Sequence, residues 1–390
     1  MVRFDTAERR QRLAVRHALA APVRTPEDVT RAVAALHSTD PASMMLSVLA
    51  RMQEPSIAEV ERALYDDRTL VRLLVMRRTV FAVPSEDAAA YLAATRRSVA
   101  ESEYRKLVAL LAASGTSDPD AWLARAHDAA LAAFDRLGVF TSADLAASDP
   151  LLAERVEISA GTKYATRQSI ASRLLTVMSA QGHVVRARPA GTWASTQFRW
   201  ASMRQWLPEL TELTDADQAR ALVARRWLAR FGPARPEDLQ WWTGWTKGHT
   251  TAALGRLETA EVELEGGTGL VLADDLEPTP EPDPWVALLP ALDPTTMGWK
   301  HRDWYLGPHA EQVFDINGNA GPTIWKDGEI VGGWAILDDG SVAVRLLADV
   351  GAEASAAIEA RAQDLQDRLA GTVIRARARG WTPVERELRG

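Results

Sequence analysis

The sequence contains no cysteine among its 390 residues. This absence excludes disulfide bonds, thiolate nucleophiles, iron–sulfur clusters and zinc sites with cysteine ligands. The seven histidines show neither the HxxxH nor the HExxH spacing of common metal sites, and no phosphate-binding loop of the GxxxxGK[ST] form occurs. We therefore expect a protein that works without a metal or another cofactor.

Long apolar runs are also missing. No run approaches the roughly 18 residues of a membrane-spanning helix. The N-terminal sequence MVRFDTAERRQRL is charged and lacks the apolar stretch of a secretory signal. A hydrophobic fraction of 47% and a charged fraction of 25% are typical of globular proteins. We expect a cytoplasmic protein of two to four domains, with a monomer as the simplest assembly.

Lysine is scarce, since only five of the 45 basic residues are lysine, and a genome rich in G and C explains most of this bias toward arginine. The net charge of −7 argues against a protein that simply coats nucleic acid. The charge is distributed unevenly, however. Residues 151–204 hold eight basic and two acidic residues, whereas residues 258–283 hold nine acidic residues and no basic one. The first of these segments is a candidate for binding an anionic partner.

The N-terminal part predicts short helices followed by a strand. A helix is expected over about 26–36, and Asp40 and Pro41 are typical of the cap and first turn of the next helix. A further helix is expected from Ser56 through Leu64, then a strand over 79–83, then a helix over about 86–97. Short helices followed by a strand pair are the outline of a winged helix.

The same outline is predicted twice more. Helices over about 119–137, from Thr141 and over 168–181 precede strands at 183–189 and 192–200. Helices at 218–231, after Arg235 and at 247–257 precede a strand pair at 260–273. A Pro-rich and acidic linker (276–284), a β-rich part (285–346), a closing helix (352–370) and a basic tail (375–388) complete the chain. The basic segment 151–204 thus falls on the last helix and the hairpin of the second outline, the elements that meet DNA in such units.

Several strings along the chain resemble the AlkZ-like and YcaQ-like tandem winged-helix DNA glycosylases. These strings are LHSTDPASMMLSVLAR, MRRTVFAVP, WLARAHDAALAAF, TKYATRQSIASRLLT, RPAGTWASTQFRW, LQWWTGW, LLPALDPTTMGWKHRDWYL, NGNAGPTIW and VGGWA. The resemblance implies an α+β fold of three winged-helix units, C-shaped around duplex DNA, with a β-rich C-terminal part. The expected divisions are 1–118, 119–210, 211–284 and 285–390.

The resemblance also implies an activity, the release of alkylated or crosslinked bases. The family's active site carries a Gln-x-Gln or Gln-x-Asp motif before the helix that begins here at Pro41. In this sequence the matching positions are His37, Ser38 and Thr39, followed by Asp40. The family's MRGT motif is MRRT here, with Arg78 in place of glycine, and Phe81 stands where the family often has histidine.

His37, Thr39 and Asp40 are the candidate catalytic residues. An N-alkylated purine is already cationic, so a modest polar site suffices to release it. His37 could take a proton from water, Thr39 could hold that water, and Asp40 could orient His37 or stabilise positive charge on the sugar. The alternatives are structural. Asp40 is favoured as a helix cap, His37 as a hydrogen-bonding boundary residue, and Thr39 as a second local cap.

The candidate DNA-binding residues are mostly arginines. They would contact phosphates, and Gln168 and Arg173 could reach base edges. The alternative is that about half of them are solvated surface charges, and that most tryptophans are core residues, with Trp193 the best exception near a hairpin tip. The full set is Arg51, Arg77, Arg78, Lys163, Arg167, Gln168, Arg173, Arg186, Arg188, Trp193, Arg199, Lys300 and Arg302.

Three functions follow from these observations. The favoured one is a monofunctional DNA repair glycosylase for bulky or crosslinked N-alkylated purines, associated with the nucleoid, that serves either genotoxin resistance or general repair. The second is a non-catalytic DNA-binding protein, either a damage sensor or a transcriptional regulator, which the departure from the Gln motif favours. The third is a scaffold for protein interactions, which the net negative charge favours. Steep salt dependence of DNA binding separates the first two from the third.

Overall fold

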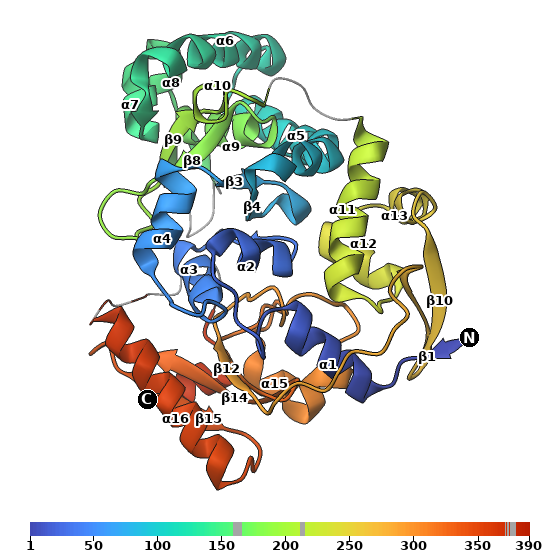
Figure 1. The fold of residues 1–390 in the computed structure, drawn as a ribbon. Coiled ribbons are helices and arrows are strands. Elements are labelled where there is room, and N and C mark those ends of the chain that lie inside the picture. The colour runs from blue at the N-terminus through green and yellow to red at the C-terminus, as the bar shows by residue number, and fades with distance from the viewer. Residues whose placement is uncertain (159–165, 211–214, 371, 373, 375–379) are drawn as a thin grey trace. The chain divides into compact units, whose positions relative to one another are not determined.

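The computed structural model describes residues 1–158, 166–210, 215–370, 372, 374 and 380–390 (Figure 1). Backbone contacts divide the chain into two compact units, one of residues 1–60 with 221–390 and one of residues 61–220. Each unit combines helices with small, mostly antiparallel sheets, which confirms the mixed helix-and-sheet class. The finer division at residues 118, 210 and 284 stays a prediction.

The second unit is formed by a continuous stretch of chain. It contains strands β3 (Leu70–Leu74), β4 (Val80–Pro84), β5 (Val139–Phe140), β6 (Arg155–Ile158), β7 (Thr166–Ser169), β8 (Val184–Ala187) and β9 (Arg199–Ser202). Its helices are α5 (Ala88–Ala113), α6 (Pro119–Leu137), α7 (Ser142–Ala147), α8 (Pro150–Ala153), α9 (Ile170–Ala180) and α10 (Met203–Trp206). Three single turns are η1 (Arg62–Asp66), η2 (Met76–Arg78) and η3 (Ser85–Asp87).

A three-stranded antiparallel sheet in the order β5-β9-β8 organises the later part of this unit. Helix α9 packs against α5 and α7, and α5 also contacts α6 (Figure 1). The core between these helices buries Trp122, Phe134, Phe140, Ile170 and Leu174. Helix α6 has the predicted bounds, and Gly138 ends it with a φ of 64°, a left-handed conformation that suits glycine.

Three predictions in this unit were wrong in detail. Helix α5 continues to Ala113 rather than ending near residue 97, since neither glycine nor proline interrupts it before Gly115. The helix predicted over 168–181 begins at Ile170, because the preceding residues form strand β7 and Ser169 caps the helix. The strand predicted over 192–200 is confined to β9, so a long loop separates it from β8.

The first unit is assembled from both ends of the chain. Its strands are β1 (Val2–Arg3), β2 (Leu36–His37), β10 (Thr259–Leu264), β11 (Gly267–Leu272), β12 (Val286–Leu289), β13 (Thr323–Lys326), β14 (Glu329–Ile336) and β15 (Val342–Leu346). Its helices are α1 (Thr6–Arg16), α2 (Pro26–Ala32), α3 (Pro41–Leu49), α12 (Pro236–Thr243), α13 (Lys247–Leu254), α14 (Asp303–Leu306), the turn η4 (Gly307–His309), α15 (Ala310–Val313), α16 (Ala352–Leu369) and α17 (Pro383–Arg389). Helices α4 (Ile57–Glu61) and α11 (Ala216–Phe231) include the residues at which one unit gives way to the other.

The predicted β-rich region forms one four-stranded sheet in the order β12-β13-β14-β15. Helix α16, the predicted closing helix, packs on β12 and β15 (Figure 1). Helix α17 packs on β14. Gly333 permits this second contact, because a Cβ atom there would lie 2.3 Å from Val384 Cγ1. Helix α2 is shorter than predicted, since Ala34 has a φ of 59° and the chain then forms β2.

The acidic, Pro-rich segment 276–284 contains no helix or strand, as predicted for a linker or strap. Helix α1 holds the start of this segment. Arg12 donates to the carbonyl of Glu277 at 2.5 Å and forms an ion pair with Asp275 at 3.1 Å. Glu8 accepts a hydrogen bond from the backbone N–H of Thr279 at 2.9 Å. The segment is therefore fixed to the N-terminal helix.

Candidate functional site

Helix α3 begins at the predicted residue. The Asp40 carboxylate accepts hydrogen bonds from the Ala42 backbone N–H at 3.1 Å and from the Ser43 hydroxyl at 3.3 Å. Pro41 occupies the first helical position, where no N–H is needed. Asp40 is only 8% exposed. Its role as a helix cap is thus confirmed, while its catalytic role stays a prediction.

The candidate residues before this helix differ in exposure. His37, at the end of β2, is partly buried, and Thr39 is exposed. Ser38 between them is fully buried and donates a hydrogen bond to the Met44 sulfur at 3.2 Å. This internal bond fixes the backbone that carries the two outer side chains.

Asp40 and Ser43 also line a cavity of the first unit. Its wall combines apolar side chains, two carboxylates and an aromatic ring that is only partly buried. The lining residues are Asp40, Ser43, Leu46, Pro290, Ala291, Pro322, Trp334, Ala335, Ile336, Ile374, Trp381, Glu385 and Arg389. The wall thus carries two carboxylates and one guanidinium around a cavity of about 50 Å³.

The C-terminal helix α17 supplies the far wall of this cavity. Glu385 accepts hydrogen bonds from the backbone N–H and the hydroxyl of Thr382, at 3.0 and 2.9 Å, and completes a capping box. The Arg389 guanidinium lies 3.9 Å from the centre of the Trp381 ring and donates to the carbonyl of Ile336. The sequence was interpreted here only as a basic tail, although the pattern Thr382-Pro383-x-Glu385 indicates a capped helix. Residues 375–379 of that tail lie outside the described part of the chain.

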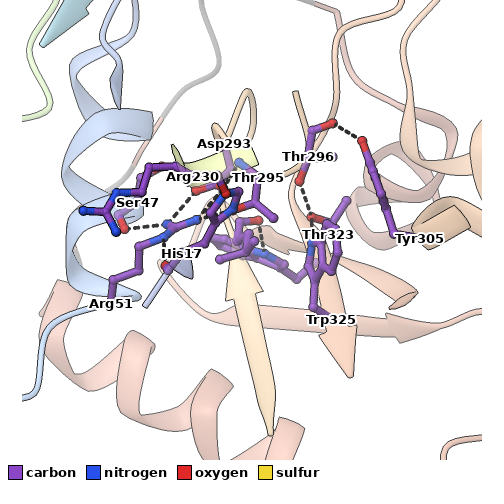
Figure 2. Close-up of polar contacts among 12 residues, drawn as sticks. His17, Ser47, Arg51, Arg230, Asp293, Thr295, Thr296, Tyr305, Thr323 and Trp325 are labelled. Carbon is purple, nitrogen blue, oxygen red and sulfur yellow. Dashed lines mark hydrogen bonds and ion pairs between the residues drawn. The ribbon is translucent and has the colours of Figure 1, made fainter. Parts of the chain in front are cut away.

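The Arg51 side chain is wholly buried, which argues against the contact with DNA that the sequence predicts. It forms two bonds to the Asp293 carboxylate, at 2.7 and 2.9 Å, and both side chains have no exposed surface (Figure 2). Its remaining donors reach the carbonyls of His17 and Ser47 and the Thr295 hydroxyl, at 2.8–2.9 Å. A phosphate cannot reach this guanidinium, so its role is to stabilise the first unit.

His17 belongs to the same buried network (Figure 2). Its ring nitrogens lie 2.8 Å from the Thr295 hydroxyl and 3.2 Å from the Arg230 carbonyl. Its ring is stacked 5.7 Å from that of Trp299. Burial, followed by the charge of Arg51, holds the pKa of His17 well below its usual value of 6.5. The imidazole is therefore neutral in the folded protein near neutral pH.

Arg77 and Arg78 lie in the turn η2 of the second unit, with φ angles of 51° and 58°. Arg78 occupies the position at which the resemblance places glycine, and this left-handed conformation is one that glycine adopts freely. Arg78 is exposed and forms an ion pair with Glu103 at 3.3 Å. Arg77 is partly buried. Two adjacent non-glycine residues with positive φ are uncommon and are typical of strained functional segments.

The predicted recognition helix carries fewer of the candidates than expected. Arg173 lies exposed on α9, but Arg167 and Gln168 lie on strand β7, the first exposed and the second partly buried. Lys163 lies outside the described residues. The sequence pattern missed the β6–β7 hairpin because its strands are short and polar, which periodicity detects poorly.

The candidates near the hairpin of β8 and β9 fall into two groups. Arg188 forms ion pairs with Glu61 at 3.0 Å and Asp66 at 2.9 Å, so its charge is compensated. Arg186 instead lies 4.0 Å from the ring centres of both Phe198 and Trp200. Burial and then the charge of Arg72 lower the pKa of Arg186 to about 9. Arg199 on β9 and Trp193 in the loop before it are partly exposed.

The basic cluster of the C-terminal part is partly structural. Lys300 is exposed, and its backbone N–H donates to Asp238 at 2.9 Å. Arg302 is partly buried, with its guanidinium 5.0 and 4.7 Å from the ring centres of Trp241 and Phe314.

The predicted role of most tryptophans as core residues is confirmed for Trp200, Trp242 and Trp245, which are at most 6% exposed.

No group of three or more histidine, aspartate or glutamate side chains in the described ranges is arranged to hold a metal ion. Within the same ranges, no helix has the length and hydropathy needed to cross a membrane.

Comparison with known proteins identifies the family. A family model described as "DNA glycosylase AlkZ-like" matches residues 30–368. The DNA glycosylase AlkZ of Streptomyces sahachiroi has a similar solved structure, with a TM-score of 0.74 and 20% sequence identity over 97% of this chain and 100% of that one. No curated protein matches. Because the family model covers most of its length, the chain belongs to the AlkZ-like DNA glycosylase family.

Proposed function

We propose that the protein is a monofunctional DNA glycosylase that hydrolyses the N-glycosidic bond of bulky or crosslinked N-alkylated purines. The observation that carries the proposal is the family match over residues 30–368. The resemblance to glycosylases that act on alkylated or crosslinked bases supports the choice of substrate.

The scaffold in this proposal is a set of tandem winged-helix units. The order α6, β5, α7, α9, β8, β9, with the sheet β5-β9-β8, supports one such unit. In the first unit the order is α11, α12, α13, β10 and β11, and Ala234, between α11 and α12, forms an antiparallel bridge with Leu270 of β11. This arrangement supports a second winged-helix unit. The chain order α2, β2, α3, α4, β3, β4 supports the remaining one.

The proposed chemistry relies on the residues before α3. His37 accepts a proton from the attacking water, and the Thr39 hydroxyl orients that water. Asp40 stabilises the positive charge that develops on the sugar while it caps the helix. A cationic purine leaves as a neutral base, so no strong general acid is required. Thr39 is exposed and His37 partly buried, which supports access of substrate to both.

DNA contacts are proposed for the exposed or partly exposed basic residues, without Arg51. Electrostatic attraction to the phosphate backbone would supply most of the affinity, and Gln168 and Arg173 would face the bases. The set is Arg77, Arg78, Lys163, Arg167, Gln168, Arg173, Arg186, Arg188, Trp193, Arg199, Lys300 and Arg302.

The second candidate function is a non-catalytic DNA-binding protein that senses damage or regulates transcription. Two observations favour it. His37 and Thr39 replace the glutamines that the resemblance leads one to expect, and both Asp40 oxygens already accept hydrogen bonds within the helix cap.

A single-turnover assay decides between these functions. Duplex DNA with simple N7-alkylguanine, bulky N7-alkylguanine or an interstrand crosslink is incubated with excess protein, and base release is measured. We expect release by the wild type and its loss in His37→Ala and Thr39→Ala. Release that survives both substitutions would retain the enzyme and reject this site. Tight, salt-sensitive binding without release from any lesion would establish the sensor or regulator.

A further inference from the structure

Arg186 occupies an unusual environment in the second unit. It lies on β8 directly opposite Trp200 of β9, so both side chains project from the same face of the sheet. The guanidinium carbon is 4.0 Å from the ring centre of Trp200 and 4.0 Å from that of Phe198. Cation–π contacts of this kind hold the guanidinium in place without using its N–H groups. The rings fix the guanidinium in position, and no described residue accepts a hydrogen bond from it, so its donors can bind a ligand.

The charge of Arg186 is not compensated by an acidic side chain among the described residues. Two effects lower the pKa of Arg186. The larger is burial, which removes water from the guanidinium, and the second is repulsion by the charge of Arg72. Arg188, two residues along the chain, is the reverse case, because Glu61 and Asp66 pair with it at 3.0 and 2.9 Å. The fold thus neutralises one of these arginines and leaves the other as a cation.

A second guanidinium lies close by. Arg72 of β3 is 2% exposed, and its guanidinium carbon is 5.8 Å from the centre of the same Phe198 ring. Strands β3 and β8 are in contact within this unit. Two arginines directed at one ring create a positive potential that is stronger than that of an isolated surface arginine, because the surrounding rings exclude water.

We propose that Arg186, with Arg72 behind it, is a preformed binding site for a single phosphate group. The ligand that the site takes is a phosphodiester of the DNA backbone. An oxyanion at the free edge of the Arg186 guanidinium would accept charge-assisted hydrogen bonds and offset the repulsion from Arg72. This inference rests on the proposed DNA binding, but it does not require base release.

A phosphate-binding role and a purely structural role for Arg186 predict opposite changes in stability when the residue is substituted. Partly buried cations that lack a partner destabilise a fold, and natural proteins keep such strain where function requires it. If the site binds phosphate, Arg186→Gln leaves the free protein as stable as the wild type or more so. If the ring contacts exist only for stability, the same substitution lowers the melting temperature.

The test compares Arg186→Gln in the full chain with the control Arg97→Gln, which removes an exposed arginine that pairs with Glu101 and is not among the proposed DNA contacts. Binding to an undamaged DNA duplex is measured between about 50 and 200 mM salt. Arg186→Gln should weaken binding about tenfold at the low end and reduce the slope of log affinity against log salt by about 0.9, the value of one phosphate contact. Arg97→Gln should change the slope by much less. Equal slopes for all three proteins, or equal losses in both variants, would overturn the proposal.

Inorganic phosphate distinguishes the source of the ligand. Phosphate that raises the melting temperature of the wild type but not of Arg186→Gln indicates a site that takes a free phosphate as well as a DNA phosphate. If Arg186→Gln weakens DNA binding and inorganic phosphate does not change the melting temperature, the ligand is the backbone phosphodiester.

The variant Arg186→Lys keeps the charge without the planar donors and should recover only part of the affinity. A lower melting temperature of Arg186→Gln with an unchanged salt slope would assign the residue to structure. Base release, measured separately, reports on the glycosylase proposal.

Discussion

Arg51 and Asp293 form a two-point ion pair that is buried completely, although 242 residues separate them in the sequence. Each partner has further bonds. Arg51 donates to the Thr295 hydroxyl, and Asp293 accepts from the Ser47 hydroxyl at 2.7 Å and from the Thr295 backbone N–H at 2.9 Å. The pair therefore joins the end of α3 to the loop after β12 in a fully bonded polar core.

Removing one partner of this pair should destabilise the protein severely. Arg51→Ala leaves the Asp293 carboxylate buried without its partner, and such changes cost about 3–5 kcal/mol. Denaturant unfolding measures the loss. Arg97→Ala, which removes an 86% exposed arginine paired with Glu101, should change the stability by less than about 1 kcal/mol. A similar small change in Arg51→Ala would contradict the structural role.

Stability should fall in mild acid because of His17. Its pKa is lowered well below 6.5 in the folded state, so the unfolded chain binds a proton that the folded protein does not. The contribution of His17 to stability is thus complete above about pH 6.5 and decreases as the pH falls below that value. Melting temperatures from pH 8 down to pH 5 should show a steeper decline for the wild type than for His17→Gln.

Part of this pH dependence should survive in the variant. Burial, followed by the charge of His127, lowers the pKa of His183 to about 4, so His183 adds a slope of the same sign. The double variant His17→Gln/His183→Gln should be flatter than either single variant. Identical slopes in the wild type and His17→Gln would show that folding does not lower the pKa of His17.

Two substitutions at Asp40 should separate its cap from its proposed charge effect. Asparagine caps helices as well as aspartate does, so Asp40→Asn should keep the wild-type stability, whereas Asp40→Ala should lose about 1 kcal/mol. If the carboxylate stabilises the developing positive charge, Asp40→Asn should slow base release about 100-fold with unchanged DNA affinity. Unchanged release in Asp40→Asn would leave Asp40 as a helix cap alone.

The contact of α17 with β14 should depend on Gly333. An added Cβ would lie 2.3 Å from Val384 Cγ1 and 3.1 Å from the Pro322 carbonyl oxygen, so Gly333→Ala should displace the helix. We expect a loss of about 1–3 kcal/mol and reduced base release, because α17 carries Glu385 and Arg389, which line the cavity beside Asp40. The control Gly248→Ala, whose Cβ would meet only Thr246 Oγ1 at 3.9 Å, should be neutral or stabilising. Release unaffected by Gly333→Ala would separate this cavity from the activity.

The sequence predicted local features better than distant ones. The start of α3 at Asp40 and Pro41 and the bounds of α6 follow from neighbouring residues, and the structure confirms them. The sequence predicted a DNA contact for Arg51, because nothing near this residue in the sequence indicates its partner Asp293. The cavity wall from Trp381 and Glu385 was missed for the same reason, since it forms only when the C-terminal helix packs beside α3 residues that lie far away in the chain.

The assembly of the first unit from both chain ends has a consequence for biosynthesis. A ribosome adds about 5–20 residues per second, so roughly 10–50 s pass between the synthesis of Arg51 and that of Asp293, 242 residues later. During this interval residues 61–220 emerge as a complete folding unit, while the first 60 residues wait without most of their packing partners. Nascent chains should therefore gain protease resistance in two stages, with the early N-terminal segment protected last.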